Sequence, residues 1–448
     1  MTSAAATIFA LASGPGRAGV AVLRISGPHA GRAIKSLTAR ALPEPRRAAR
    51  RRFLDRAGDI IDDGLLLWFP APASFTGEDV AELQVHGGTA IVAALCQALS
   101  GLGLRHAGPG DFTRRAFENG KLDLTAAEAI ADLVDAETEG QRRQALRQMQ
   151  GELAALYDGW RARLLSVLAL IEAEIDFPDE DLPDALASRA APEIDSLVGA
   201  MEAHLADHGR GERTRDGYRI AILGAPNAGK SSLLNALARR EAAIVSETPG
   251  TTRDVVEVRL VLAGFPVWIA DTAGLREAAD AIESEGVRRA LARADEADLR
   301  IAVVEGAAQS LPEGLCERLS RQDFLIVSKG DLDTRPALAA VSSLGLAPLH
   351  VSTRTGAGVD ELLTRISARV SADLTQSEAP VLTRLRHRET VTDARAHLQR
   401  ARDAFDIGGA ELVAEDVRLA ARALGRLTGR IDVEDVLGEI FSSFCIGK

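Results

Sequence analysis

The segment with the clearest chemistry is a glycine-rich stretch at residues 224–231, GAPNAGKS. It matches GxxxxGK[ST] between an apolar stretch and a helix predicted to start near Ser232. Glycines let such a backbone curl until its N–H groups face phosphate oxygens, at the positive end of the helix dipole. Lys230 would reach the β- and γ-phosphates, and the Ser231 hydroxyl would ligate Mg²⁺. The sequence therefore predicts a nucleotide phosphate site with Mg²⁺.

Two further segments fit the same site. Residues 271–274, DTAG, follow a predicted strand, which puts the Asp271 carboxylate at a strand tip near the metal. Gly274 would offer an N–H donor to the γ-phosphate. Residues 250–254, GTTRD, lie between the two motifs, where a switch loop with a threonine ligand for Mg²⁺ belongs. Their order and spacing strengthen the prediction of a nucleotide hydrolase.

The base-reading segment is residues 328–331, SKGD, where guanine-specific enzymes usually carry Asn-Lys-x-Asp. The Asp331 carboxylate can accept the N1–H and amine donors of guanine, which adenine does not supply, and the Lys329 stem can cover the base. Ser328 replaces the asparagine whose amide ties this loop to the phosphate loop. We therefore expect weaker nucleotide affinity with guanine choice retained. Ser352, Thr353 and Arg354 fit the loop that backs the base.

Water activation needs an unusual arrangement. Many GTPases place Gln directly after DxxG, but Leu275 stands there and cannot orient water. Acidic side chains follow, including Glu283, and Asn227 offers an amide oxygen suited to a monovalent cation beside the phosphates. Arg276 is either an arginine finger or a solvated arginine.

Elements that could position these residues follow from periodicity. Residues 1–119 predict an α+β domain, with strands at 21–25, 52–54 and 65–69 and a helix at 91–99. From about residue 120 the pattern is helical: Thr125 and Glu128 form a predicted capping box, and apolar residues from Leu146 to Ile175 predict one long helix. Residues 209–213 read as a polar linker.

The following region alternates strands and helices. Strands are predicted at 219–223, 267–270, 299–304, 324–327 and 349–352, which is typical of a parallel sheet with helical crossovers. The chain is helical again after about residue 375. We interpret it as an N-terminal domain at 1–119, a helical domain in two halves at 120–214 and 374–448, and an α/β P-loop GTPase domain inserted at 215–373.

Composition sets the broad class. The chain has 448 residues, 46% hydrophobic and 26% charged, which predicts a soluble protein of two to three domains. Its three cysteines are far apart, which disfavours disulfides and a zinc site. A net charge of −11 disfavours nonspecific coating of nucleic acid. No signal peptide and no run of about 20 apolar residues is seen, so we expect a cytoplasmic protein, or one in an organelle lumen if a transit peptide was removed.

Over essentially its whole length the chain resembles the MnmE (TrmE) family of tRNA-modification GTPases. The most specific pieces are residues 77–79, GED, with 86–88, HGG; residues 121–124, KLDL; and the terminal residues 444–448, FCIGK. The resemblance implies a folate-binding-like N-terminal domain that forms a homodimer. It implies that, with a flavin-dependent partner of the MnmG type in a heterotetramer, the enzyme adds a (carboxymethyl)aminomethyl group to carbon-5 of the wobble uridine of tRNA. The one-carbon unit would come from 5,10-methylenetetrahydrofolate or formyl-tetrahydrofolate, and FAD would belong to the partner.

The resemblance also implies site residues. Arg24, Glu82, Lys121 and Lys448 match folate-contacting positions. Asn227, Ser246, Thr248 and Thr251 match a K⁺ site that takes the place of an arginine finger, and Ser231 and Thr252 match the Mg²⁺ ligands. Glu283 matches the family's catalytic acidic residue, and we add Lys230 and Cys445 as catalytic candidates from their own chemistry. The GTP-binding positions are Asn227, Ala228, Gly229, Lys230, Ser231, Ser232, Ser246, Glu247, Thr248, Pro249, Gly250, Thr251, Thr252, Asp271, Thr272, Ala273, Gly274, Ser328, Lys329, Asp331, Ser352, Thr353 and Arg354.

Several interpretations stay open. Cys445 is either a nucleophile toward carbon-6 of uracil or a buried structural cysteine. The arginines at 46–47 and 50–52 either touch tRNA phosphates or form a solvated face. The main alternative function is an Era-like regulatory GTPase in ribosome assembly, but the C-terminal region does not look like its basic RNA-binding module. A folate-binding scaffold without turnover is disfavoured by the intact Lys230, Ser231 and Asp271.

Overall fold

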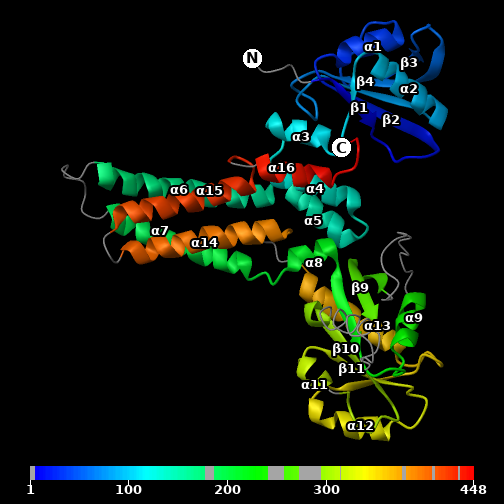
Figure 1. Cartoon of the computed structure of the whole chain (residues 1–448), viewed down its shortest axis with the longest axis vertical. Coiled ribbons are helices and arrows are strands. Elements are labelled where there is room, and N and C mark those ends of the chain that lie inside the picture. The colour runs from blue at the N-terminus through cyan, green and yellow to red at the C-terminus, as the bar shows by residue number, and fades with distance from the viewer. Residues whose placement is uncertain are drawn as a thin grey trace, which may run out of the picture. The chain divides into compact units, whose positions relative to one another are not determined.

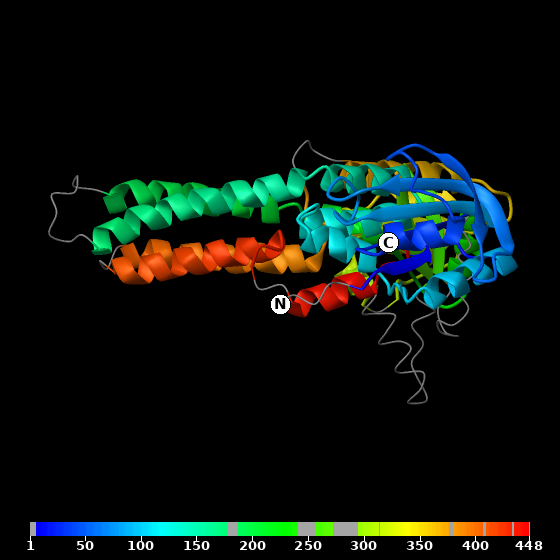
Figure 2. The same ribbon diagram turned by 90° about the horizontal axis from the view of Figure 1, so that it is seen from above.

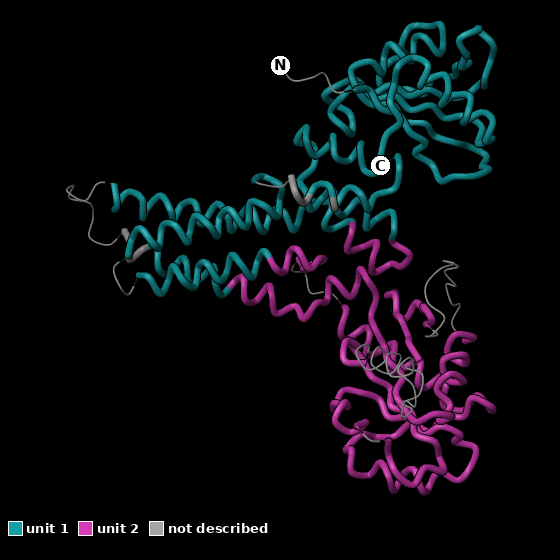
Figure 3. The backbone as a smooth tube through the Cα atoms, viewed as in Figure 1, with its two compact units in different colours: residues 1–135, 146–199, 390–448 teal, residues 136–145, 200–389 magenta. Residues whose placement is uncertain are grey.

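The computed structural model describes residues 6–176, 186–240, 257–271, 294–312, 314–375, 380–405, 409–431 and 434–447. The chain divides into two compact units (Figure 3). The first comprises residues 1–135, 146–199 and 390–448, and the second comprises residues 136–145 and 200–389. The four-segment division predicted from the sequence stays an interpretation, because these units group the segments differently.

The first unit contains a six-stranded, mostly antiparallel sheet in the order β3-β4-β5-β2-β1-β6 (Figure 1). Its inward side chains form one core with the helices α1 and α2. The strands and helix predicted in this region are confirmed. The elements are β1 (Ile8–Leu11), β2 (Ala18–Ser26), α1 (Ala30–Thr38), β3 (Ala49–Leu54), β4 (Ile60–Phe69), β5 (Val80–Gly87), α2 (Thr89–Gly101), β6 (Arg105–His106) and α3 (Asp111–Glu118).

Helices make up the rest of this unit. Those that contribute to it wholly or in part are α4 (Leu124–Asp135), α5 (Glu139–Met149), α6 (Glu152–Asp176), α7 (Leu186–Leu205), α14 (Leu385–Phe405), α15 (Ala410–Leu427) and α16 (Glu434–Ser442). The helices α6 and α15 run side by side (Figure 2). An ion pair of 2.8 Å joins Arg418 on α15 to Glu172 on α6, and His397 on α14 lies 2.9 Å from Asp416 on α15. A helical bundle results.

The single helix predicted from Leu146 to Ile175 is wrong. The chain breaks between α5 and α6, at Gly151, whose φ is 86°. This left-handed conformation ends a helix and is cheap only for glycine, so the apolar spacing continues across a break that periodicity does not reveal. The predicted cap at Thr125 is also wrong, because the Asp123 carboxylate accepts the Thr125 and Ala126 N–H groups at 2.8 and 3.1 Å.

The second unit contains a six-stranded sheet in the order β12-β11-β10-β7-β9-β8, parallel except for the edge strand β8. Apolar cores cover both of its faces. The five predicted strands are confirmed, whereas β8 was missed and the predicted linker at 209–213 lies largely in a helix, α8. The elements are α8 (Arg210–Asp216), β7 (Tyr218–Leu223), α9 (Lys230–Arg240), β8 (Glu257–Leu262), β9 (Phe265–Asp271), β10 (Leu299–Glu305), α11 (Leu315–Arg318), β11 (Phe324–Ser328), α12 (Arg335–Val341), η1 (Ser342–Leu344), β12 (Pro348–Val351) and α13 (Val359–Leu374). Within the described ranges, no helix combines the length and apolar character needed to cross a membrane.

Candidate nucleotide site and N-terminal cluster

The predicted phosphate loop joins the central strand β7 to α9. Its backbone takes left-handed conformations at Asn227 and Gly229, with φ of 61° and 97°. At Gly224 a Cβ atom would lie 2.3 Å from the Val303 carbonyl oxygen, so only glycine fits there. Asparagine tolerates positive φ better than most residues, which explains how a side chain with an amide can occupy this turn. The loop thus faces the N-terminus of α9, where an anion is favoured.

Lys230 is buried at the start of α9. Its ammonium donates to the carbonyl oxygens of Gly224 and Ala225 at 3.0 and 2.9 Å. Burial lowers the pKa of Lys230, and the charge of Asp271 opposes that shift. The lysine is therefore folded over the loop that would hold the phosphates. Ser232 is exposed on the first turn of α9.

Ser231 and Asp271 form the candidate Mg²⁺ site. The Ser231 hydroxyl donates to Asp271 Oδ2 at 2.5 Å, and β9 delivers this carboxylate at its last residue. The other oxygen, Asp271 Oδ1, is buried and has no hydrogen-bond partner in the described part of the chain. An unsatisfied buried carboxylate oxygen calls for a ligand. Oxygen donors of this kind are those that Mg²⁺ prefers, so the residues present fit the ion.

Ser328 ties the base-reading loop to the phosphate loop. Its hydroxyl, at the end of β11, donates a hydrogen bond of 2.6 Å to the Ala228 carbonyl oxygen. The expectation that this serine removes the tie is wrong, because the shorter side chain still reaches the loop. The weaker affinity inferred from its loss has no structural basis.

The Asp331 carboxylate is held from two sides. The Ser352 hydroxyl donates to Oδ1 at 2.7 Å, and the Arg354 guanidinium donates to Oδ2 at 2.9 and 2.6 Å. These contacts lower the pKa of Asp331, so the carboxylate that would read guanine is ionised. Lys329 is paired with Glu305, and Thr353 is exposed between its two neighbours in the loop. The structure therefore brings the predicted base-reading residues together.

Other predicted positions lie outside the described residues, so their roles stay predictions. They are Ser246, Glu247, Thr248, Pro249, Gly250, Thr251, Thr252, Thr272, Ala273, Gly274, Glu283 and Lys448.

Arg24 and Glu82 meet on one face of the N-terminal sheet. They are direct neighbours on the antiparallel strands β2 and β5, with Arg24 Nε 2.9 Å from Glu82 Oε1. The Arg24 guanidinium also lies 5.6 Å from the ring centre of Phe75 and 5.7 Å from that of Phe112. Phe75 is partly exposed, so a flat ligand would find a carboxylate, a cation and an aromatic surface together. This donor set fits a folate, whose pterin has N–H donors and whose tail is anionic.

The loop that carries Phe75 is anchored by polar contacts that the sequence did not suggest. The Glu78 carboxylate accepts the Ser26 hydroxyl and the Arg115 guanidinium, each at 2.7 Å. Gly77 in this loop has a φ of 78°. Lys121 Nζ donates to the Pro72 carbonyl oxygen at 3.0 Å, so Lys121 contacts the same loop. The GED motif therefore contributes a loop anchor.

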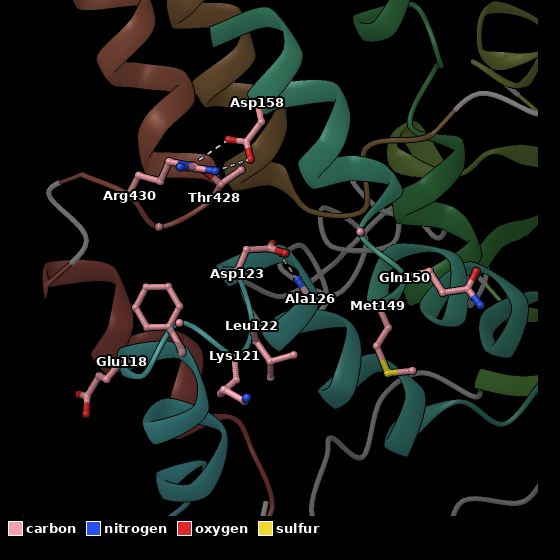
Figure 4. A pocket seen from close by; sticks show the side chains of 14 residues that line it. Glu118, Lys121, Leu122, Asp123, Ala126, Met149, Gln150, Asp158, Thr428 and Arg430 are labelled. Carbon is pink, nitrogen blue, oxygen red and sulfur yellow. Dashed lines mark hydrogen bonds and ion pairs between the residues drawn. The ribbon is translucent and has the colours of Figure 1, made fainter. Parts of the chain in front are cut away.

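Lys121 also lines a cavity of about 630 Å³ in the first unit (Figure 4). Figure 4 shows Met149, the last residue of α5, and Gln150, which follows it, among the lining side chains. Arg430 lies across from them, paired with Asp158 at 3.0 and 2.7 Å. The KLDL motif and the helical part of the unit thus both line this cavity.

The C-terminal tail runs beside the Arg24 cluster. Ile446 bridges to Pro109, and the Gly447 carbonyl oxygen lies 3.5 Å from Arg24 Nη1. Cys445 is exposed, as is Ile446, so the interpretation of Cys445 as a buried structural residue is wrong. Its role as a nucleophile stays a prediction.

Comparison with known proteins decides the family. The sequence matches the family described as MnmE helical domain over residues 124–445, and that described as GTP-binding protein TrmE N-terminus over residues 7–121. A protein of Paramagnetospirillum magneticum named tRNA modification GTPase MnmE is 57% identical over 444 residues, covering 99% of both chains. A protein of the same name from Parvibaculum lavamentivorans is 57% identical over 446 residues, covering 99% of this chain and 100% of its own. The chain belongs to the MnmE family.

Membership of the MnmE family favours a tRNA-modification GTPase over the Era-like alternative, because the match spans nearly the whole chain. Among solved structures, the G domain of the T. maritima FeoB iron transporter matches 34% of this chain and 98% of its own, at 24% identity with a TM-score of 0.26. What sequence reasoning missed in the site are its supports, such as Arg115 and the contact partner of Ser328. In the sequence, only the residue types of these supports indicated that they could form polar contacts. Their contact partners could not be identified, because they lie far away in the sequence.

Proposed function

We propose that this chain binds and hydrolyses GTP and acts in the modification of tRNA, as the names of its relatives say of them. The observation that carries the proposal is the Ser231–Asp271 contact at 2.5 Å with Asp271 Oδ1 unsatisfied beside it. It leaves an oxygen-lined position next to the phosphate loop. The Ser328 contact to the same loop then links phosphate binding to base reading.

The roles of the site residues follow from their contacts. The Lys230 ammonium gives up its hydrogen bonds to the two loop carbonyl oxygens and binds phosphate oxygens instead. Its burial strengthens the attraction between the ammonium and the phosphates. Ser231 and Asp271 would hold Mg²⁺, whose charge would offset the negative charge of the phosphates. Asp331, kept ionised by Ser352 and Arg354, accepts the guanine donors, and Glu283 is the proposed acidic group that holds the attacking water.

Potassium is part of the proposal. Asn227 stands in the phosphate loop at a φ of 61°, where its amide oxygen would ligate K⁺ together with groups from residues 246–251. The ion would supply a positive charge that other GTPases obtain from an arginine finger.

The modification chemistry is proposed from the family. The Arg24–Glu82 cluster, with Lys121 and Lys448, would bind a tetrahydrofolate carrying the one-carbon unit. A flavoprotein of the MnmG type would join a homodimer of this chain in a heterotetramer, in the cytoplasm, to act on carbon-5 of the wobble uridine. Cys445 is exposed in the tail beside this cluster, which suits a nucleophile that must reach a base.

The first experiment is GTP turnover by the purified chain in potassium and in sodium buffer. We expect strong stimulation by potassium that is lost in Asn227→Ala. Asn235→Ala is the matched control, because Asn235 is exposed on the adjacent helix α9. Equal rates in both salts would remove potassium from the proposal and leave the GTPase standing, and no turnover in either salt would contradict the proposed activity.

A second experiment tests the modification. The chain is incubated with an MnmG-type flavoprotein, tRNA, GTP and methylenetetrahydrofolate, and the wobble nucleoside is analysed by mass spectrometry. A mass increase at uridine that needs both proteins and the folate is expected. Unmodified tRNA despite rapid GTP turnover would argue against the assigned reaction.

A further inference from the structure

The strands β8 and β9 form a hairpin that reaches from the nucleotide site to the segment at residues 136–145. At one end, β9 finishes at Asp271, which contacts Ser231. At the other end, the turn at Ala263 and Gly264 has φ values of 52° and 82°. This turn contacts the start of α5, which belongs to the same compact unit as the hairpin up to residue 145.

The contact at the turn leaves no room for a side chain. The Gly140 N–H donates to the Gly264 carbonyl oxygen at 2.9 Å. A Cβ atom on Gly140 would lie 2.6 Å from the Phe265 ring and 3.0 Å from that same carbonyl oxygen. Because real Cβ atoms essentially never approach so closely, the ring is seated where only glycine fits.

A second contact lies along β8. Arg259 forms an ion pair with Glu137, and its side chain is only 15% exposed. The guanidinium also covers Trp268 of β9, 5.0 Å from the ring centre. A cation that is stacked on an aromatic ring and shielded from water interacts more strongly than one on an open surface.

Trp268 connects the hairpin to the chain just before β7. Its indole N–H donates to the Asp216 carbonyl oxygen at 3.0 Å, and a Cβ on Gly217 would lie 2.5 Å from its ring. Nearby, Gln141 on α5 donates from its amide to the Arg215 carbonyl oxygen at 2.8 Å. The hairpin, the start of α5 and residues 215–217 therefore form one packed junction.

We propose that Gly140 and Glu137 are positioning residues for the nucleotide site: they fix the hairpin, and the hairpin fixes Asp271. The proposal rests on the proposed GTP hydrolysis. The strand β9 is paired with β8 from Phe265 to Ala270 and with β7 from Val267 to Asp271, so one hydrogen-bonded strand runs from the turn to Asp271. Displacing the turn therefore displaces Asp271 relative to Ser231, and a change at Asp271 is felt at the turn.

Because coupling between two sites acts in both directions, the junction could also transmit the nucleotide state from Asp271 to α5. If the nucleotide changes the position of Asp271, the same coupling must change the packing of Gly140 against Phe265. The helix α5 continues from the second unit into the first at residue 146 and ends at Met149. Its first turns are thus one element through which the nucleotide state would reach the helical region, beside α7 and α14, which also cross the boundary between the units.

The experiment compares Gly140→Ala with wild type in the full-length chain. Two quantities are measured: kcat and KM for GTP, and the hydrogen exchange of the α5 amides with GDP against a non-hydrolysable GTP analogue. We expect kcat to fall roughly three- to thirty-fold with KM within about twofold, the range seen when coupling residues are changed. The exchange difference between the two nucleotides, present in wild type, should be lost.

Matched variants separate positioning from damage. Gly159→Ala, in α6 with open space at its Cβ, should behave as wild type. In a Phe265→Ala background the Gly140→Ala change should have a smaller further effect, because the ring that the methyl meets most closely is gone and only the 3.0 Å contact to the Gly264 carbonyl oxygen remains. If Gly140→Ala does not fold, Glu137→Gln serves instead, with Glu139→Gln as its control, since Glu139 pairs only with Arg142 and Arg143 of its own helix among the ion pairs described.

Wild-type kcat in Gly140→Ala, or in Glu137→Gln if that variant takes its place, would overturn the inference while leaving the proposed GTPase intact. So would a reduced kcat with the exchange difference retained, because the residue would then act only on local structure. Absence of GTP turnover in wild type itself would instead contradict the proposed function.

Discussion

The Ser328 hydroxyl donates a hydrogen bond of 2.6 Å to the Ala228 carbonyl oxygen, 100 residues away in the chain. This one contact joins the loop that reads the base to the loop that holds the phosphates. Both groups are buried, so removing the donor leaves a carbonyl without a partner.

Ser328→Ala should therefore weaken GDP binding about three- to tenfold, the effect of leaving a buried acceptor unsatisfied at about 1 kcal/mol. Titration with a fluorescent GDP analogue measures it. Ser328→Asn should keep most of the affinity, because the amide can make the same bond. The control is Ser342→Ala, whose hydroxyl donates to the Ala339 carbonyl oxygen on the exposed surface of the same unit. Equal affinity in Ser328→Ala and wild type would show that the tie is dispensable.

Asp271→Ala should lower GTP turnover by about a hundredfold or more, because the carboxylate that helps to hold Mg²⁺ is lost. In Asp271→Asn, which keeps the shape, we expect the Mg²⁺ concentration for half-maximal turnover to rise. Magnesium titrations of turnover check both variants. Thr364→Ala, on the exposed face of α13, is the control. An unshifted Mg²⁺ dependence in Asp271→Asn would place the ion elsewhere.

Arg24→Ala should reduce binding of a tetrahydrofolate at least about tenfold, since it removes a cation and leaves Glu82 unpaired in a half-buried position. Calorimetry with a stable folate such as formyl-tetrahydrofolate measures the loss. Arg50→Ala is the matched control: Arg50 pairs with Asp63 at 2.9 Å in the same sheet, but is far more exposed. Comparable folate affinity in Arg24→Ala and Arg50→Ala would argue against this site.

His204 should make the protein less stable in mild acid. Burial lowers its pKa from 6.5 to about 4, so the folded state favours the neutral ring. A lowered folded pKa contributes stability that is present above pH 6.5 and is lost as the pH falls toward 4. Between pH 7 and pH 5 wild type should lose at most about 2 kcal/mol more than His204→Gln. Thermal unfolding of both proteins at the two pH values measures the difference, and parallel losses would contradict it.

The sequence was informative where chemistry is local. The phosphate loop follows β7, Asp271 ends β9 and Asp331 lies three residues beyond β11, and parallel strands bring their carboxyl ends to one edge of a sheet. The supports of these residues were not predictable, because a hydroxyl such as that of Ser328 gives no sign of which carbonyl it reaches. The partner is set by the crossover connections of the fold.

The spacing of apolar residues also failed to predict some elements, because it does not report backbone conformation or strand pairing. Apolar spacing ran through Gly151 in helical phase, but the backbone turns there into a conformation that spacing does not encode. The edge strand β8 was missed because no motif marked it. Arg24 and Glu82 were matched to one ligand only by family resemblance; that they face each other across two strands needed the register of the sheet.

The tryptophan under Arg259 has a practical consequence. The chain has three tryptophans, and Trp68 and Trp160 are almost fully buried, the first in the core of the N-terminal sheet and the second on α6. Trp268 alone lies in the second unit, half-buried, with a charged group on its face and its N–H engaged by the chain before β7. Its emission therefore depends on contacts that a shift of the hairpin would alter. Trp268 is therefore an intrinsic fluorescence probe of the hairpin. The Trp268→Phe variant gives the emission of Trp68 and Trp160 alone, against which nucleotide-dependent changes in the emission of Trp268 can be measured.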